Sequence, residues 1–148
     1  MKEKYIDIAL KEAKKAYRND EVPVGAIIIK DGEIIAKAHN KKINTNNIFA
    51  HAEMLAIEKA SKKIGDWRLN DCVMYVTLET CPMCASAIQQ SRIKQIYIGT
   101  TSNIKSNKNV MMSIFDNDEY YHKVNVQYLN NKECSNILTD FFVTKRQK

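Results

Sequence analysis

The chain has 148 residues, of which 45% are hydrophobic and 27% are charged, and its formal net charge is +6. This length suits one domain with a substantial core and is short for two, and the composition is ordinary for a globular protein. No apolar run approaches the roughly 20 residues of a membrane helix, and the start shows no secretory signal, so we expect a cytoplasmic protein without a membrane segment.

The positive charge favours a polyanionic partner such as nucleic acid only weakly, because many basic proteins simply expose solvated lysines. The four cysteines are not expected to form a disulfide framework, because cytosolic thiols stay reduced. Net charge therefore does not identify the partner. The cysteines are expected to serve a role other than disulfide bonding.

The first part of the chain predicts a helix and a hairpin. Residues 3–17 place their apolar side chains on one helical face, with most lysines outside it. The segment 22–38 has branched apolar runs on both sides of Asp31 and Gly32, and an Asp-Gly pair in this setting is typical of a hairpin turn.

The middle of the chain predicts a loop, a helix and a buried strand. Residues 40–47 are polar and turn-prone, whereas residues 52–61 favour a helix that Gly65 would end. Residues 72–78 form a continuous apolar run, as expected of a strand covered on both faces.

The rest of the chain predicts a helix over 85–93, strands over 95–100 and 124–129, and a closing helix within 131–148, with 101–116 as a loop. No repeat or linker divides the chain, so residues 1–148 are expected to form a single domain. Strands joined through helices predict a mixed or parallel sheet layered with helices.

Two short motifs stand at predicted helix starts. Cys81 and Cys84 follow a strand, and at this spacing on a first helical turn their sulfurs point to the same side. His51 and Glu53 begin the preceding helix. One imidazole and two thiolates suit zinc, and three protein ligands leave a fourth position for water, as in catalytic sites. Glu53 is placed to accept and pass on the proton of that water.

The cysteine pair also has interpretations that involve no catalytic zinc. A Cys-x-x-Cys motif is also compatible with a redox pair or a structural zinc site. The redox interpretation gives no account of the histidine and the glutamate, and a structural site needs a fourth ligand. The remaining candidates are weak: Cys72 and Cys134 are typical small apolar core residues, and His39 and His122 are ordinary polar positions.

The segments His51-Ala52-Glu53 and Cys81-Pro82-Met83-Cys84 resemble the signature of the zinc-dependent cytidine/deoxycytidylate deaminase superfamily, in which this zinc and glutamate chemistry is already known. Within it, the chain resembles the bacterial tRNA-specific adenosine deaminases. The stretches EVPVGA, DWRL and LTDFF, the last followed by a basic tail, carry this narrower resemblance.

The resemblance implies a three-layer α/β/α fold with a central mixed sheet of about five strands flanked by helices, usually in a homodimer. It implies Zn²⁺ bound by His51, Cys81 and Cys84, with Glu53 as the proton shuttle. The reaction would be hydrolytic deamination of adenosine to inosine, with release of ammonia, at the wobble position of a tRNA anticodon stem-loop. Extruding a base costs little in such a loop.

Substrate contacts are expected by the same resemblance in three places. Asn40 matches a family asparagine that contacts the nucleoside, although an asparagine in a polar loop is often simply a turn residue. The other expected contacts are Val24, Ser102 and Asn103, and in the C-terminal region Phe142, Lys145 and Arg146. Basic residues near aromatic ones suit a single-stranded RNA loop, but a solvated tail after two core phenylalanines is the alternative.

The chain departs from the family pattern at two points. Thr80 replaces the usual proline before the first cysteine, and as a good N-cap residue it is expected to begin the helix that presents Cys81. The segment 101–116 lacks the family's glycines and has no acidic residue before Asp116, so we expect it to follow another path.

Because of that segment, a deaminase of a free nucleobase or nucleoside, of the guanine or cytosine type, is the main alternative function. A catalytically inactive RNA-binding paralogue is a second alternative. The presence of Glu53 argues against an inactive paralogue, since a catalytically inactive subunit does not need the proton shuttle.

Overall fold

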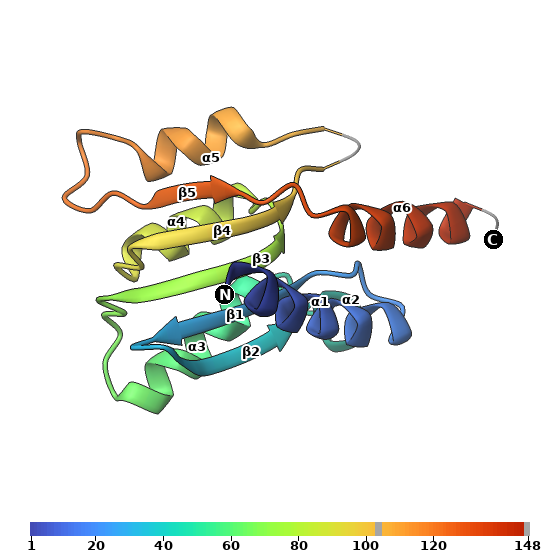
Figure 1. The fold of residues 1–148 in the computed structure, drawn as a ribbon, viewed down its shortest axis with the longest axis horizontal. Coiled ribbons are helices and arrows are strands. Elements are labelled where there is room, and N and C mark those ends of the chain that lie inside the picture. The colour runs from blue at the N-terminus through green and yellow to red at the C-terminus, as the bar shows by residue number, and fades with distance from the viewer. Residues whose placement is uncertain (103–104, 147–148) are drawn as a thin grey trace.

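The computed structural model describes residues 1–102 and 105–146, and within them it is a sheet of five strands with helices on both faces (Figure 1). The strands are β1 (Gly25–Lys30), β2 (Glu33–His39), β3 (Cys72–Leu78), β4 (Gln95–Thr100) and β5 (Asn125–Tyr128). The helices are α1 (Lys2–Arg18), α2 (Lys42–Thr45), α3 (Ala52–Ile64), α4 (Pro82–Gln90), α5 (Lys108–Phe115) and α6 (Lys132–Arg146).

The sheet is mixed, with the order β2-β1-β3-β4-β5. Strand β1 is antiparallel to both β2 and β3, whereas β3, β4 and β5 run parallel. Parallel neighbours need crossover connections, and α4 and α5 supply them. The ends of β3 and β4 therefore meet at one edge of the sheet, and the chain segments that follow both strands start there. The predicted fold class is confirmed.

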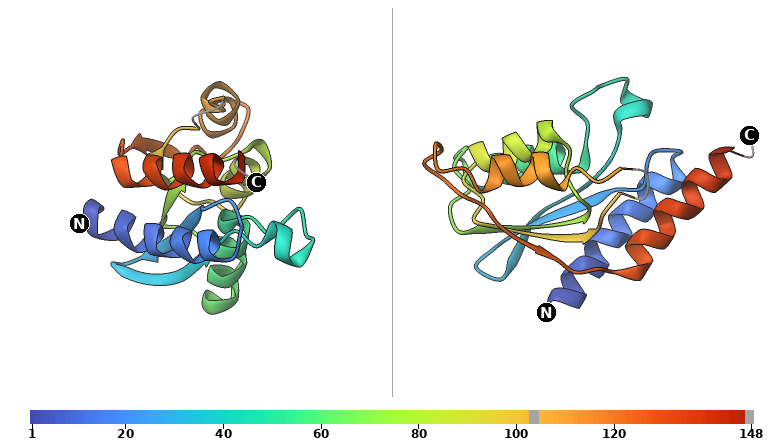
Figure 2. Two further views of the ribbon diagram at one scale, coloured as in Figure 1. Left: turned by 90° about the vertical axis from the view of Figure 1, so that its right-hand side faces the viewer. Right: turned by 90° about the horizontal axis from the view of Figure 1, so that it is seen from above.

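The helices form two layers, with α3, α4 and α5 on one face of the sheet and α1 and α6 on the other (Figure 2). Successive side chains of a strand point to opposite faces, so β1 supplies both cores: Ile28 packs on the α3 side, and Ile27 and Ile29 pack on the α1 side. This explains why the central strands read as continuous apolar runs. None of the described helices combines the length and the apolar character needed to cross a membrane.

The predicted turns are confirmed. Asp31 and Gly32 join β1 to β2 with positive φ angles of 52° and 77°, as the tightest hairpin turns require. Gly65 follows α3 in the left-handed conformation, with φ of 75°, and ends that helix as expected.

Two short helices were missed. Residues 40–47 are not a simple loop, because α2 forms within them, and its first backbone N–H groups are bound by the distant Glu21. The segment 101–116 is likewise not loop throughout, since α5 occupies its second half. Met111 and Phe115, four residues apart, are the buried face of α5, so that spacing was already present in the sequence.

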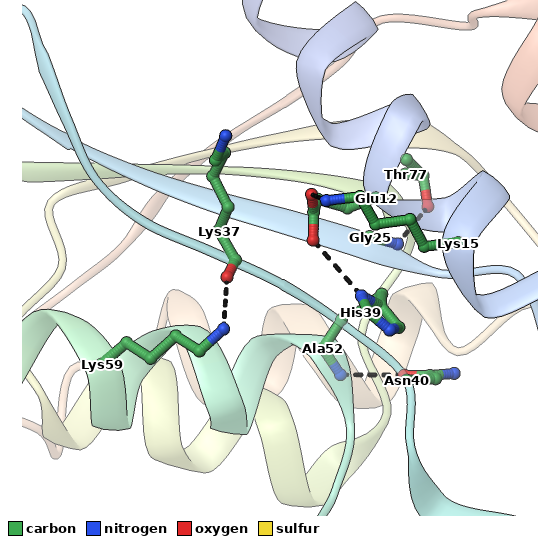
Figure 3. A network of polar contacts seen from close by, with 9 residues as sticks. All are labelled: Glu12, Lys15, Gly25, Lys37, His39, Asn40, Ala52, Lys59 and Thr77. Carbon is green, nitrogen blue, oxygen red and sulfur yellow. Dashed lines mark hydrogen bonds and ion pairs between the residues drawn. The ribbon is translucent and has the colours of Figure 1, made fainter.

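The packing of α1 on the sheet depends on Gly25. A Cβ atom at this position would lie 2.0 Å from the Ala9 carbonyl oxygen and 2.6 Å from the Ala13 nitrogen. The Gly25 N–H also donates a 3.1 Å hydrogen bond to the Thr77 hydroxyl, which lies beneath the helix (Figure 3). Any side chain here would push α1 away from β1.

We therefore expect Gly25→Ala to lower the free energy of unfolding by about 3 kcal/mol or more, because the methyl group meets backbone atoms that cannot rotate away. Gly32→Ala is the matched control, since its Cβ has nothing within 4 Å and only its positive φ is strained. That control should cost about 1–2 kcal/mol in urea denaturation. Equal losses in the two variants would contradict the packing argument.

Candidate active site

Two helix starts lie side by side on the same face of the sheet. Helix α3 begins at Ala52 with His51 in extended conformation just before it, and α4 begins at Pro82 with Cys81 in the same position. Proline is favoured at a first helical position because its fixed φ suits the helix and its missing N–H would have no partner there. The contact between α3 and α4 brings His51 to both cysteines.

The metal-type triad predicted from the sequence is assembled. The His51 Nδ1 atom lies 3.7 Å from the Cys81 sulfur and 3.4 Å from the Cys84 sulfur. A tetrahedral zinc ion, with bonds of about 2.3 Å to sulfur and 2.0 Å to nitrogen, holds such atoms about 3.5 Å apart. The donor set and its spacing therefore fit zinc. Among the described residues this group has three protein donors, all within 4.8 Å of one another.

The triad already stabilises negative charge on sulfur. Hydrogen bonds from the Cys84 thiol and from His51 lower the pKa of Cys81 to about 4, against the opposing effect of burial. The same hydrogen bond, burial and the nearby Glu53 carboxylate raise the pKa of Cys84. The interaction with Cys81 raises the pKa of His51 in turn. One thiolate thus forms readily, and a cation would favour the second.

Glu53 lies in the first turn of α3 and is 4% exposed. Burial is the main cause that raises the pKa of its carboxyl group to about 7, and the negative charge of Cys81 adds to it. A carboxyl group with a pKa near neutral pH can both take up and release a proton under working conditions. Its position beside the triad therefore suits a proton shuttle.

A cavity of about 220 Å³ opens over the triad and Glu53. It lies at the sheet edge where β3 and β4 end. Its lining includes Val24, Asn40 and Ser102, three of the positions expected to contact substrate. The lining residues that sequence reasoning did not select are Glu21, Val22, Lys42, Ile43, Leu78, Glu79 and Asn107.

Asn40 is a structural cross-link as well as a lining residue. Its Oδ1 accepts a 2.8 Å hydrogen bond from the Ala52 N–H at the start of α3, and its Nδ2 donates one of its hydrogens to the Val22 carbonyl at 3.1 Å. Figure 3 shows Asn40 directed at Ala52, next to His39, which contacts Glu12 of α1 at 3.3 Å. Asn40 is therefore more than a turn residue, and its contact with substrate stays a prediction.

Two buried carboxylates on the lining hold chain segments in place. Glu21 accepts the backbone N–H groups of Ile43 and Asn44 at the start of α2. Burial raises its pKa, but these donors outweigh burial and hold the pKa below its usual value. Glu79 has a comparable set of donors in the segment after β4. The signals were their places in the sequence: Glu21 opens EVPVGA, and Glu79 ends the strand before the cysteines.

Of the expected contacts near the C-terminus, Phe142 and Lys145 are not among the described residues that line the cavity. Phe142 packs edge-on against Phe141 in α6, and the Lys145 ammonium is paired with Asp20 at 2.9 Å. Lys145 is thereby paired with the residue that precedes Glu21 of the lining. Arg146 is the last residue of α6, and Asn103 lies outside the described residues.

The prediction that Thr80 caps α4 is wrong. Cys81 occupies the N-cap position, and the Thr80 side chain is fully buried, with no hydrogen-bond partner for its hydroxyl among the described residues. The reason is the orientation of the side chain. Thr80 lies one residue before the N-cap, where its side chain is directed into the core behind β3, so its hydroxyl does not face the first N–H groups of α4. Cys72 and Cys134 are buried core residues, as predicted.

Comparisons with known proteins agree with this geometry. The family model of the MafB19-like deaminases matches residues 1–146. The chain is 40% identical over 147 residues to the tRNA-specific adenosine deaminase of Bacillus subtilis (strain 168), an alignment that covers 99% of this chain and 91% of that protein.

Solved structures give the same result. A structure from a study of A-to-I editing by tRNA:A34 deaminases at the wobble position of transfer RNA superposes with a TM-score of 0.84 at 35% identity, covering 91% of this chain and 99% of the other. The guanine deaminase of Bacillus subtilis superposes less closely, with a TM-score of 0.66 at 28% identity, covering 97% and 93%.

The unpaired Thr80 hydroxyl gives a stability prediction. Thr80→Val replaces it by a methyl group of the same shape and should raise the free energy of unfolding by about 1 kcal/mol, since a buried unpaired hydroxyl is costly. Thr77→Val is the matched comparison in the same strand region: it removes the acceptor of the Gly25 N–H and should cost about 1–3 kcal/mol. Urea denaturation measures both, and a destabilised Thr80→Val variant would contradict the assignment.

Proposed function

Because the chain belongs to the family of tRNA-specific adenosine deaminases, we propose that it converts adenosine to inosine at the wobble position of a tRNA anticodon loop. The observation that carries this proposal is the buried Glu53 carboxyl group beside the His51, Cys81 and Cys84 triad, on the floor of one cavity. The reaction is hydrolytic and releases ammonia.

We assign zinc to the triad on its donor set and spacing. When bound there, zinc lowers the pKa of water so that hydroxide is available near neutral pH. His51 contributes a neutral imidazole nitrogen, and the two cysteines contribute thiolates. Three protein donors among the described residues fit an open catalytic site better than a closed structural one.

Glu53 moves the protons. It takes a proton from the attacking water and delivers it to the ring nitrogen as the C6 carbon is attacked. It then takes the proton of the new C6 hydroxyl group and delivers it to the amine, which leaves as ammonia while the C6 carbonyl forms. A pKa of about 7 makes both transfers accessible to one group.

The proposed partner is a tRNA anticodon stem-loop, whose unpaired bases are extruded at little cost. Val24, Asn40 and Ser102 line the cavity and are proposed to contact the nucleoside. By family resemblance we propose a homodimer and a cytoplasmic location.

Phe142, Lys145 and Arg146 are proposed to contact RNA outside the cavity. The Lys145 ammonium lies 5.6 Å from the centre of the Phe141 ring as well as beside Asp20. These contacts hold Lys145 beside the residue that precedes Glu21 of the lining, and we propose that the phosphates flanking an extruded base pass there.

A free-nucleobase deaminase is the alternative that the same active centre allows. The similarity to a guanine deaminase structure is weaker in both identity and superposition than the similarity to the tRNA deaminase structure. An inactive RNA-binding paralogue does not account for Glu53, which is buried beside the triad.

Glu53→Gln tests the reaction. Inosine formation is measured on an anticodon stem-loop with a wobble adenosine, with free guanine and cytosine assayed for ammonia release. The variant keeps the size of the side chain but cannot carry the proton, so we expect kcat/KM to fall by about 100-fold or more while zinc content stays near one per chain. Cys84→Ala should lose the zinc as well.

If ammonia is released from a free base and no inosine forms in the stem-loop, the protein is a deaminase of free nucleobases instead. Full activity in Glu53→Gln would contradict the mechanism for any substrate.

Lys145→Ala combined with Arg146→Ala tests the C-terminal contact. Removing two phosphate contacts should weaken stem-loop binding and reduce the slope of log affinity against log salt concentration by about 1.5. Lys62→Ala combined with Lys63→Ala is the control, because both exposed lysines lie at the far end of α3 and carry the same charge. An unchanged slope in the Lys145→Ala, Arg146→Ala variant would contradict the proposed RNA contact.

A further inference from the structure

Glu79 is the most extensively hydrogen-bonded carboxylate near the active site. It follows β3, is 4% exposed and lines the cavity. Its Oε1 accepts the backbone N–H groups of Asn107 at 2.9 Å and Ser102 at 3.3 Å. Its Oε2 accepts the hydroxyl groups of Tyr128 at 3.0 Å and Ser106 at 3.2 Å.

These four donors determine what Glu79 does. A carboxylate offers about four acceptor positions, so each oxygen already has the two partners it can accommodate. The acceptor positions of Glu79 are therefore taken up by groups of the protein itself. Glu53, in contrast, has only its own backbone N–H and the Cys84 thiol as donors among the described residues.

The donors come from three separate parts of the chain. Ser102 follows β4, Ser106 and Asn107 lie directly before α5, and Tyr128 ends β5. Glu79 itself follows β3, so one buried charge ties together the ends of all three parallel strands and the start of α5. The Glu79 N–H also donates to the Thr100 carbonyl at 2.9 Å, which fixes the carboxylate in register with β4.

The held residues form part of the cavity. Ser102 and Asn107, whose backbone N–H groups bind Glu79, line the same cavity as Glu53 and His51. The triad and the shuttle, however, stand at the starts of α3 and α4, and none of these four hydrogen bonds involves them. Loss of the Glu79 carboxylate would thus displace the wall of the cavity and leave its floor in place.

We propose that Glu79 is a positioning residue for substrate recognition, which holds Ser102 and Asn107 on the cavity wall and thereby sets KM with little effect on kcat. This inference rests on the proposed deaminase function for its kinetic consequence, but its structural part stands independently of the substrate.

Glu79→Ala and Glu79→Gln form the test pair. Alanine leaves two backbone N–H groups without an acceptor, so KM for the anticodon stem-loop should rise about 10-fold or more, with kcat within about threefold of the wild type. Glutamine keeps one oxygen for the two N–H groups, and its amide can donate to the Ser106 and Tyr128 hydroxyls, which also accept. It should restore KM to within about threefold.

Glu33→Ala is the control for loss of a carboxylate, since Glu33 is 72% exposed in the hairpin and far along the sheet from the cavity edge. Its KM should equal that of the wild type. Zinc content should stay near one per chain in all variants. Loss of zinc in Glu79→Ala would overturn the inference, because it would place Glu79 in support of the metal site instead.

Amide hydrogen exchange supplies a readout that needs no activity. The N–H groups of Ser102 and Asn107 should exchange faster in Glu79→Ala than in the wild type, and Glu79→Gln should slow them again. Unchanged exchange would overturn the inference. If the wild type proved inactive on RNA, the proposed function would fail, and exchange would still decide the role of Glu79.

Should Glu79→Ala fail to fold, Tyr128→Phe removes a single donor hydroxyl. The inference then predicts faster Asn107 exchange and a KM raised about two- to fivefold, with kcat preserved. A parallel fall in kcat, or no change in either KM or exchange, would contradict it.

Discussion

The chemistry of this protein depends on the approach of the His51 imidazole to the sulfurs of Cys81 and Cys84. Nothing in the local sequence enforces that approach, because His51 and Cys81 belong to different helix starts. It follows from the sheet: β1 and β3 are neighbours, α3 packs against β1 and β2, and α4 leaves directly from the end of β3. A donor spacing of 3.4–3.7 Å therefore results from strand order and helix packing together.

Three buried glutamates around one cavity show how hydrogen-bond donors assign different roles to the same side chain. Glu21 binds the start of α2 and keeps a lowered pKa, since its N–H donors outweigh burial. Glu79 binds four donors and holds the segment after β4, the start of α5 and the end of β5 together. Glu53 is as deeply buried as Glu79 but has few donors, so burial dominates and raises its pKa to about 7. Catalytic capacity thus lies with the least satisfied carboxyl group.

The sequence predicted the sheet, the main helices and the triad, because each rests on a local signal. Apolar periodicity marks the strands and helices, and the spacing from Cys81 to Cys84 and from His51 to Glu53 is short enough to read directly. Glu21 and Glu79 could not be assigned in this way, since their partners lie more than 20 positions further along the chain. Thr80 was misassigned because capping preference says nothing of which way a side chain points at the end of a buried strand.

The segment after β4 illustrates the same principle. Glycine is needed where a loop must visit backbone conformations closed to other residues. Here the chain instead enters α5, with the Ser106 hydroxyl accepting the Lys108 N–H at 3.2 Å while donating to Glu79. Asn107, the N-cap residue of α5, has a φ of −96°, so this helix start needs no residue in the left-handed conformation. The wall of the cavity is therefore held by a buried charge here, because hydrogen bonds from Ser102, Ser106 and Asn107 to Glu79 fix the start of α5 against the end of β3.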